Sequence, residues 1–452
     1  MRPLGYNNGM RKKTRTILFF ICLILFILIT PAVILYSEGY RFDLDPPQGT
    51  IRITQTGGLF IKVFQKSAEV YLNGKMEKKT SIFTDSALIK NLLPKKYHIE
   101  VKKENYHPWE KELQIEEKEV TEAKNIILFP KDPQLENLIE NVSDFWFSPD
   151  EKKIITYEPI YTGSPDEEAS QSWALKIYDL EKNIKSYLIG EKDIYQRGAQ
   201  FFSLEFSPDS KEIYLNLGMK EQEKVFSLFL DEYPLSLKEK TQTEIPNNVA
   251  FKAFGQDIYY LDNLGNLFKS DPSLERIVKL NQEPFPVKQE TPYQLKIFPN
   301  CIFMQENEKL FMFDKEIKSF KEIFSPSVNV KISPDLKKVV YFSKSEIKVL
   351  FLDQILEQPE RRAGEEILIT RISEKINDVS WINSDYLVFT TDKNIKITEI
   401  DNRDKINIIS FLPSENANLK ELKSPRIFWS QRNKKLYVLN ESNLYSSEKL
   451  FK

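Results

Sequence analysis

The side chains that most often carry acid–base or metal chemistry are scarce in this sequence of 452 residues. It contains two histidines, His98 and His107, and two cysteines, Cys22 and Cys301. A histidine or cysteine metal site combines several such ligands at short, regular spacing, and that pattern is absent here. We therefore expect His98 and His107 to be surface or packing residues, with no metal and no cofactor.

Sequence motifs of the common enzyme classes are also missing. The chain has no G-x-S-x-G, no H-E-x-x-H, no Walker loop and no G-x-G-x-x-G. The acidic segment Ser164–Glu168 lacks the alternating oxygen ligands and the glycine of a calcium loop, so a solvated hairpin is the expected structure. We predict no catalytic residue and no enzymatic activity. The sequence assigns no binding residue.

Charge is nearly balanced over the whole sequence. The 64 Lys and Arg residues face 66 Asp and Glu residues, a formal net charge of −2. Residues 1–16 carry no acid and five bases, at Arg2, Arg11, Lys12, Lys13 and Arg15. The rest of the sequence has a small negative net charge that is spread over a large surface. Such a charge favours solubility and does not indicate a charged binding surface. No nucleic-acid partner is expected.

An apolar run follows the basic tail. Ile17–Leu35 has no charged residue and is interrupted only by Thr30 and Pro31. A helix of that length matches the ~30 Å hydrocarbon core of a bilayer. The preceding bases place residues 1–16 in the cytoplasm and the bulk of the protein outside. A cleaved signal peptide is the alternative, but the run is longer than its usual apolar core and no small-residue cleavage site follows. We predict an uncleaved single-pass anchor at 17–35 in the cell membrane.

The next two segments are a connection and a small β-domain. Residues 36–48 contain two prolines and are expected to form a short, stiff linker. Residues 49–130 alternate apolar and polar side chains, as in Tyr97–Lys102, which places His98 on the solvent face. Asn73-Gly74 supplies the positive-φ residues of a tight hairpin.

Three segments of this β-domain resemble a PEGA domain: Ala68–Lys75, Leu93–Val101 and Asn105–Trp109. The resemblance implies a β-rich, surface-associated module related to surface-layer proteins. The sequence departs from the family at its signature, because Gln65-Lys66-Ser67-Ala68 stands in place of Pro-Glu-Gly-Ala. Asn105-Tyr106 likewise replaces the usual Gly-Tyr.

Residues 131–452 contain an internal repeat. Phe145–Tyr157 has a strand, a Ser-Pro-Asp turn and a second strand, and the pattern returns at Leu204–Leu215 and Val330–Phe342. Weaker copies complete a set of seven, which start near Val142, Gln200, Val249, Tyr293, Val328, Asp378 and Pro425. Their average spacing of about 47 residues is that of a four-stranded propeller blade. We predict an all-β protein with a seven-bladed β-propeller.

The chemistry of the turn supports this prediction. Proline fixes φ and aspartate accepts from backbone N–H groups two residues on, so Ser-Pro-Asp turns the backbone sharply. The repeat resembles the Ser-Pro-Asp-Gly of TolB-like, WD40-related propellers. Glu151, Ser210 and Leu336 stand where that family has glycine.

The last repeat is one strand short of a blade. It offers strands near Phe428, at Leu436–Leu439 and at Leu444–Leu450, and the sequence then ends. Leu135–Glu140 precedes the first repeat and has no blade of its own. We predict that it pairs with the last blade and so removes an open edge.

These features favour a membrane-anchored, extracytoplasmic binding or scaffold protein. Its expected partner is an envelope protein, a peptide or a glycan. A second hypothesis stays open: a cell-envelope hydrolase or lyase that uses paired carboxylates in the propeller channel. The sequence alone does not place those side chains.

Overall fold

The structure is a computed structural model of the protein. It describes residues 12–43, 52–81, 83–162, 170–194, 198–219, 222–232, 235–240, 245, 247–327, 329–411 and 422–451. The acidic segment Ser164–Glu168 lies outside the described residues. The protein divides into two compact units. Unit 1 comprises Met1–Leu128, Glu357–Pro359 and Arg403–Lys405, and unit 2 comprises Phe129–Leu356, Glu360–Asn402 and Ile406–Lys452.

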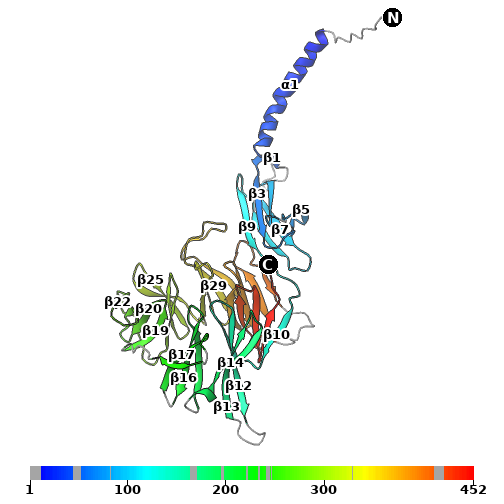
Figure 1. Cartoon of the computed structure of the whole chain (residues 1–452). Coiled ribbons are helices and arrows are strands. Elements are labelled where there is room, and N and C mark those ends of the chain that lie inside the picture. Colours follow the sequence, from blue (N-terminus) through cyan, green and yellow to red (C-terminus); the bar gives the residue numbers. More distant parts are fainter. Residues whose placement is uncertain are drawn as a thin grey trace. The chain divides into compact units, whose positions relative to one another are not determined.

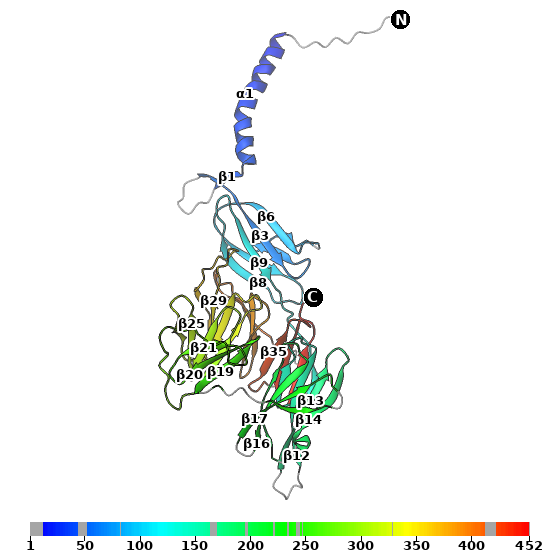
Figure 2. The same cartoon turned by 60° about the vertical axis from the view of Figure 1, so that its left-hand side comes forward.

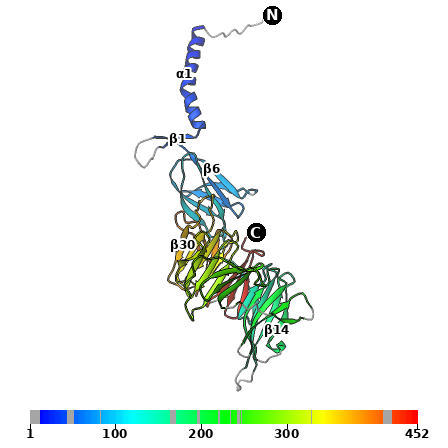
Figure 3. The same cartoon turned by 90° about the vertical axis from the view of Figure 1, so that its left-hand side faces the viewer.

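One apolar helix, α1 (Lys12–Ser37), begins the described residues and is drawn as a single helix in Figures 1 and 3. It contains the whole predicted span, including Pro31. Residues 13–37 form a helix long and apolar enough to cross a membrane, and its most apolar stretch is not buried against the protein. Large apolar side chains such as Phe26 and Leu28 are about two-thirds exposed. An anchor and a signal sequence both have these properties.

The predicted linker differs from the structure at Tyr40–Asp43. These residues form strand β1, which pairs antiparallel with β2 (Arg52–Gln55), so this part of residues 36–48 is not a free connection. The reason is a partner strand that lies beyond the two prolines and supplies the backbone groups with hydrogen bonds. Arg41 strengthens the join, because its guanidinium donates to the carbonyl of Tyr36 at 2.9 Å and stacks over that ring.

The β-domain of unit 1 has two further sheets (Figure 2). A three-stranded sheet contains β6 (Ser86–Leu92), β3 (Gly57–Val63) and β9 (Val120–Ile126). A four-stranded sheet contains β5 (Lys75–Lys79), β4 (Glu69–Leu72), β7 (Lys96–Lys102) and β8 (Trp109–Gln114). The predicted hairpin is confirmed: Asn73 and Gly74 have φ of 50° and 80° between β4 and β5. The predicted apolar face of β7 is also buried, with Ile99 and Val101 in one core cluster.

Seven four-stranded antiparallel sheets make up the described part of unit 2, and they follow the predicted repeats in order. The first three contain β11 (Asp144–Phe147), β12 (Lys153–Thr162), β13 (Ser170–Asp179), β14 (Ile184–Gly190); β15 (Gln200–Phe206), β16 (Glu212–Met219), β17 (Gln222–Phe229), β18 (Leu237–Lys240); and β19 (Asn248–Phe254), β20 (Asp257–Asp262), β21 (Leu267–Ser270), β22 (Val278–Lys279). The next three contain β23 (Tyr293–Ile297), β24 (Ile302–Glu306), β25 (Lys309–Asp314), β26 (Ser319–Phe324); β27 (Asn329–Ile332), β28 (Lys338–Phe342), β29 (Glu346–Phe351), β30 (Glu366–Arg371); and β31 (Ile376–Trp381), β32 (Tyr386–Thr391), β33 (Ile395–Glu399), β34 (Ile408–Ser410). The seventh has the order β10 (Leu135–Glu140), β37 (Asn443–Ser447), β36 (Lys435–Asn440), β35 (Arg426–Ser430). A short 3₁₀ helix, η1 (Glu191–Asp193), follows β14.

The predicted closure is therefore confirmed. β10 pairs antiparallel with β37, with Leu135 opposite Ser447 and Glu140 opposite Asn443. The strand from the start of unit 2 completes the sheet at its end, and it buries Leu135 and Ile139.

Each sheet contacts the next one in sequence order, and the seventh contacts the first. Shared apolar clusters join the first sheet to the second, the third to the fourth, the fourth to the fifth, the fifth to the sixth and the seventh to the first. An ion pair between Glu205 and Lys252 joins the second sheet to the third at 2.8 Å. Gln431 donates to the carbonyl of Ile382 at 2.7 Å between the sixth and the seventh. This closed succession of meander sheets is the topology of a β-propeller.

The Ser-Pro-Asp turns have the predicted geometry. In all three, the aspartate accepts from the N–H two residues on, at 3.1–3.2 Å. The residues that replace the family glycine, Glu151, Ser210 and Leu336, have φ of 55–62°, the left-handed region in which glycine is favoured. Two of them use their side chains to tie sheets together. Glu151 accepts from Ser430 at 2.7 Å, and Ser210 accepts from the N–H of Asp150 at 3.0 Å.

Candidate binding site

Five of the seven first strands of the repeats line one cavity in unit 2. We call these strands the inner strands: β11, β15, β19, β23, β27, β31 and β35. A cavity of about 490 Å³ is lined by residues of five of them, and its volume lies in the range of ligand pockets. We call it the inner-strand cavity. Its lining residues are Phe145, Trp146, Phe147, Pro149, Leu204, Glu205, Phe206, Lys331, Asp378, Arg426, Ile427 and Phe428.

Aromatic side chains form one part of this lining. Phe147 and Phe428 are stacked with ring centroids 3.9 Å apart, and Trp146 contacts Phe201 edge-on at 5.6 Å. Trp146 and Phe428 alternate along their strands with the buried residues Phe145, Ile427 and Trp429. Both rings also pack against the apolar clusters between sheets: Trp146 against the cluster of the first and second sheets, and Phe428 against that of the seventh and first. The cavity is therefore lined by partly buried aromatic side chains beside charged groups.

Each of the seven inner strands carries a single charged residue. These are Asp144, Glu205, Lys252, Lys296, Lys331, Asp378 and Arg426. Six of them form three ion pairs between neighbouring inner strands: Arg426–Asp144 at 2.6 Å, Lys252–Glu205 at 2.8 Å and Lys331–Asp378 at 2.7 Å. The seventh, Lys296 on β23, is the exception.

Lys296 has no carboxylate within ion-pair distance among the described residues. Its Nζ donates instead to the amide oxygen of Asn329 on β27. That oxygen also accepts from the N–H of Val330 at 2.8 Å. Burial, together with the positive charge of Lys331, lowers the pKa of Lys296 to about 8. A cation in this position is electrostatically unsatisfied.

The hydrolase hypothesis requires paired carboxylates in the propeller channel, and three carboxylates lie on the described inner strands. Asp144, Glu205 and Asp378 lie on three different inner strands, and each is paired with a cation. Glycoside chemistry needs two carboxyl groups flanking one bond, one of them protonated. The three acids of the described inner strands are each held in an ion pair with a cation from a neighbouring strand.

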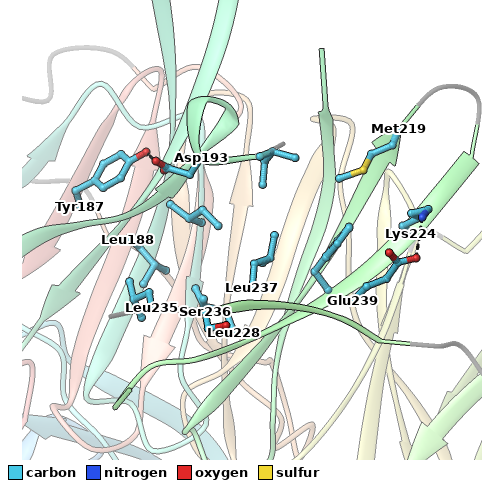
Figure 4. Close-up of a pocket in the computed structure, with 13 residues that line it drawn as sticks. Tyr187, Leu188, Asp193, Met219, Lys224, Leu228, Leu235, Ser236, Leu237 and Glu239 are labelled. Atoms are coloured by element: carbon cyan, nitrogen blue, oxygen red, sulfur yellow. Dashed lines mark hydrogen bonds and ion pairs between the residues drawn. The ribbon is translucent and has the colours of Figure 1, made fainter. Parts of the chain in front are cut away.

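A second cavity, of about 630 Å³, lies between the first and second sheets and is drawn in Figure 4. It is lined mainly by apolar side chains such as Leu188 and Leu237. Its charged groups have partners within the lining: Lys224 pairs with Glu239 at 2.8 Å, and Asp193 accepts from Tyr187. This cavity provides apolar surface, and its charges are already satisfied.

The structure also places the two histidines. His98 lies on β7 with its side chain 39% exposed, as predicted, and His107 lies in the loop before β8. The register of β7 with β8 sets Glu100 opposite Glu110, so His98, Glu100 and Glu110 have ligand atoms within 4.8 Å of one another. Sequence reasoning missed these carboxylates because it sought only histidine and cysteine partners. Glu100 is already engaged by Lys102 at 2.5 Å, and that hydrogen bond lowers the pKa of Glu100.

The sequence does not predict which of the inner-strand charges lie next to one another. Neighbouring inner strands lie about 47 residues apart, and each contains a single charged residue among mostly apolar ones. The available signal was the Ser-Pro-Asp turn, which fixes the register of three inner strands and so marks Trp146, Glu205 and Lys331 as equivalent positions.

Comparison with known proteins leaves the family open. No protein-family model matches the sequence, and no curated protein matches it. Among solved structures, the protein is similar to one from the "Crystal Structure of Mitotic Checkpoint Complex", with 10% identity, a TM-score of 0.44, and coverage of 71% of this chain and 92% of that one. It is also similar to "YCF48 bound to D1 peptide" (11% identity, TM-score 0.42, 70% and 95% covered) and to "YCF48 from Cyanidioschyzon merolae" (8%, 0.45, 70% and 99%).

Proposed function

We propose that this protein is a membrane-anchored binding protein whose β-propeller holds an envelope protein, peptide or glycan outside the cell. In this proposal α1 stays in the cell membrane with residues 1–16 in the cytoplasm, and a PEGA-like β-domain and a seven-bladed propeller follow. The observation that carries the proposal is the inner-strand cavity, where aromatic faces and charged groups from five sheets meet.

Binding is favoured over catalysis by the state of the polar groups. The three inner-strand carboxylates are each held by a cation, an arrangement that favours a structural role over general acid or base catalysis. Trp146 and Phe428 add aromatic side chains, a residue type enriched in interaction sites, to the lining of the cavity. We therefore propose that the protein is a non-catalytic scaffold.

Partner capture from intact cells tests this function. The full-length protein, tagged at its C-terminus, is crosslinked in growing cells and purified from solubilised envelopes under denaturing conditions. We expect one envelope component to be recovered at least tenfold above a tagged, unrelated single-pass membrane protein. Equal recovery of every component from both samples would contradict the proposal.

A further inference from the structure

The charges of the inner strands sum to one excess positive charge. Four cations and three anions occupy the seven strands. Three ion pairs use six of these charges, and Lys296 is the one that has no carboxylate partner among the described residues. An anion with a single charge would complete the set, whereas a dianion such as a phosphate monoester would leave a new imbalance. A carboxylate fits the deficit.

The surroundings of Lys296 explain why such an anion would bind there. Its polar neighbours come from β27, where Asn329 accepts its hydrogen bond and Lys331 repels it. On the other side, the charge of β19 is Lys252, which is directed to Glu205. Lys331 also lines the inner-strand cavity. Lys296 is not among the lining residues, but its Nζ donates to Asn329, two residues before Lys331. A carboxylate that entered the cavity beside Lys331 would therefore approach two lysines whose only described carboxylate is Asp378.

The rest of the ligand is constrained by the opposite lining. Trp146, Phe206 and Phe428 are contributed by the first, second and seventh sheets, away from Lys331 on the fifth. An extended peptide has side chains that alternate in direction, so it can set an acidic group toward the lysines and an apolar one on these rings. The cavity therefore fits a short acidic–apolar peptide segment.

We propose that the inner-strand cavity binds a peptide carboxylate of the partner protein, which pairs with Lys296 and Lys331 while a neighbouring apolar side chain packs on Trp146 and Phe428. This inference rests on the proposed binding function and names the chemistry of the partner. The carboxylate belongs to an Asp or Glu side chain or to the C-terminus of the partner, and these two sources share the same recognition.

The first test measures whether the charge of Lys296 destabilises the folded protein. In Lys296→Met the unsatisfied cation is gone, so we expect a melting temperature about 2–4 °C higher at pH 7. Between pH 8 and pH 10 the unfolded protein, with a lysine pKa of about 10.4, binds more protons than the folded protein. Wild-type stability therefore rises over this range and the advantage of the variant narrows. Lys331→Met is the control, and it should be less stable because Asp378 loses its partner.

The second test measures binding. A library of random twelve-residue peptides is selected against the full-length protein in detergent micelles at pH 7. We expect enrichment of an acidic group next to an aromatic or branched apolar residue, and at least tenfold weaker binding when Glu is changed to Gln in the selected peptides. Lys296→Met should lose the enrichment, while Lys296→Arg retains it. Synthetic peptides with free and amidated ends distinguish a C-terminal carboxylate from a side chain.

Several results would overturn this proposal. They are enrichment that ignores acidic residues, no enrichment at all, undiminished binding by a folded Lys296→Met variant, or a Lys296→Met variant less stable than wild type at pH 7. Suppose that the Lys296→Met variant binds as well as wild type, or is less stable than wild type, while envelope capture still recovers a partner. The proposed binding function then stands and only the carboxylate recognition fails. If capture recovers none while acidic peptides are selected, the cavity chemistry stands and the envelope function fails.

Discussion

Replacing Gln134–Asn141 with eight glycine and serine residues is expected to unfold most of unit 2 in conditions where the wild-type protein is folded. This change removes strand β10 while keeping the length of the connection. Leu135 and Ile139 are 7% and 3% exposed, and losing two such buried side chains destabilises by about 3–6 kcal/mol before any strand pairing is counted. That is a large part of the ~5–15 kcal/mol that stabilises a folded domain.

The reason for this effect is the position of β10 in the ring. It is the outer strand of the seventh sheet, and it holds the two ends of unit 2 together through its pairing with β37. Without it, β37 becomes an open edge and the cluster shared by the seventh and first sheets loses Ile139. Urea unfolding followed by tryptophan fluorescence measures the loss.

Point variants distinguish the loss of the buried side chains of β10 from the effect of any other change in this segment. Leu135→Ser with Ile139→Ser should destabilise strongly, whereas Glu136→Ser with Glu140→Ser, on the exposed face of the same strand, should change stability by no more than about 1 kcal/mol. A replacement variant that unfolds at the wild-type urea concentration would mean that β10 is an idle linker.

Leu25→Arg is expected to impair membrane insertion of the protein. Leu25 lies near the middle of α1, where a charged residue is unfavourable by ~2.5–3.5 kcal/mol on insertion scales. The variant should shift from the membrane pellet to the alkaline-extracted supernatant, while the apolar control Leu25→Phe stays in the pellet. Protease added to spheroplasts should trim the wild-type protein to a small membrane-bound stub.

The opposite outcome has a clear signature. A mature protein that begins after residue 30 and is released in soluble form would show that α1 is a signal sequence. Leu25→Arg would then reduce export of that soluble protein instead of its retention in the membrane.

The sequence predicted the strands of unit 2 where turn chemistry is local. Ser148-Pro149-Asp150 fixes its own hydrogen bonds within five residues, so the repeat, and with it the order of the sheets, could be recognised. The pairing of β10 was predicted because the last repeat lacked a strand. Tyr40–Asp43 was assigned wrongly because its partner β2 follows two prolines, which locally indicate a linker.

The candidate site depends on contacts that no local pattern encodes. Whether Lys296 is paired is decided by the residues on β19 and β27, at positions set by two separate repeats. The sequence shows seven inner-strand charges, but only the folded ring shows that six of them form pairs. The carboxylates near His98 were missed for the same reason, since Glu110 reaches it through strand register.

Site-specific photo-crosslinking tests most directly the claim that the inner-strand cavity holds a partner. p-Benzoyl-phenylalanine is placed at Phe428, which lines the cavity, and at Ile184, an exposed residue of β14 outside it, in the full-length protein in living cells. We expect a discrete higher-mass adduct from position 428 and none from position 184. No adduct from position 428, or the same adduct from both positions, would contradict the claim.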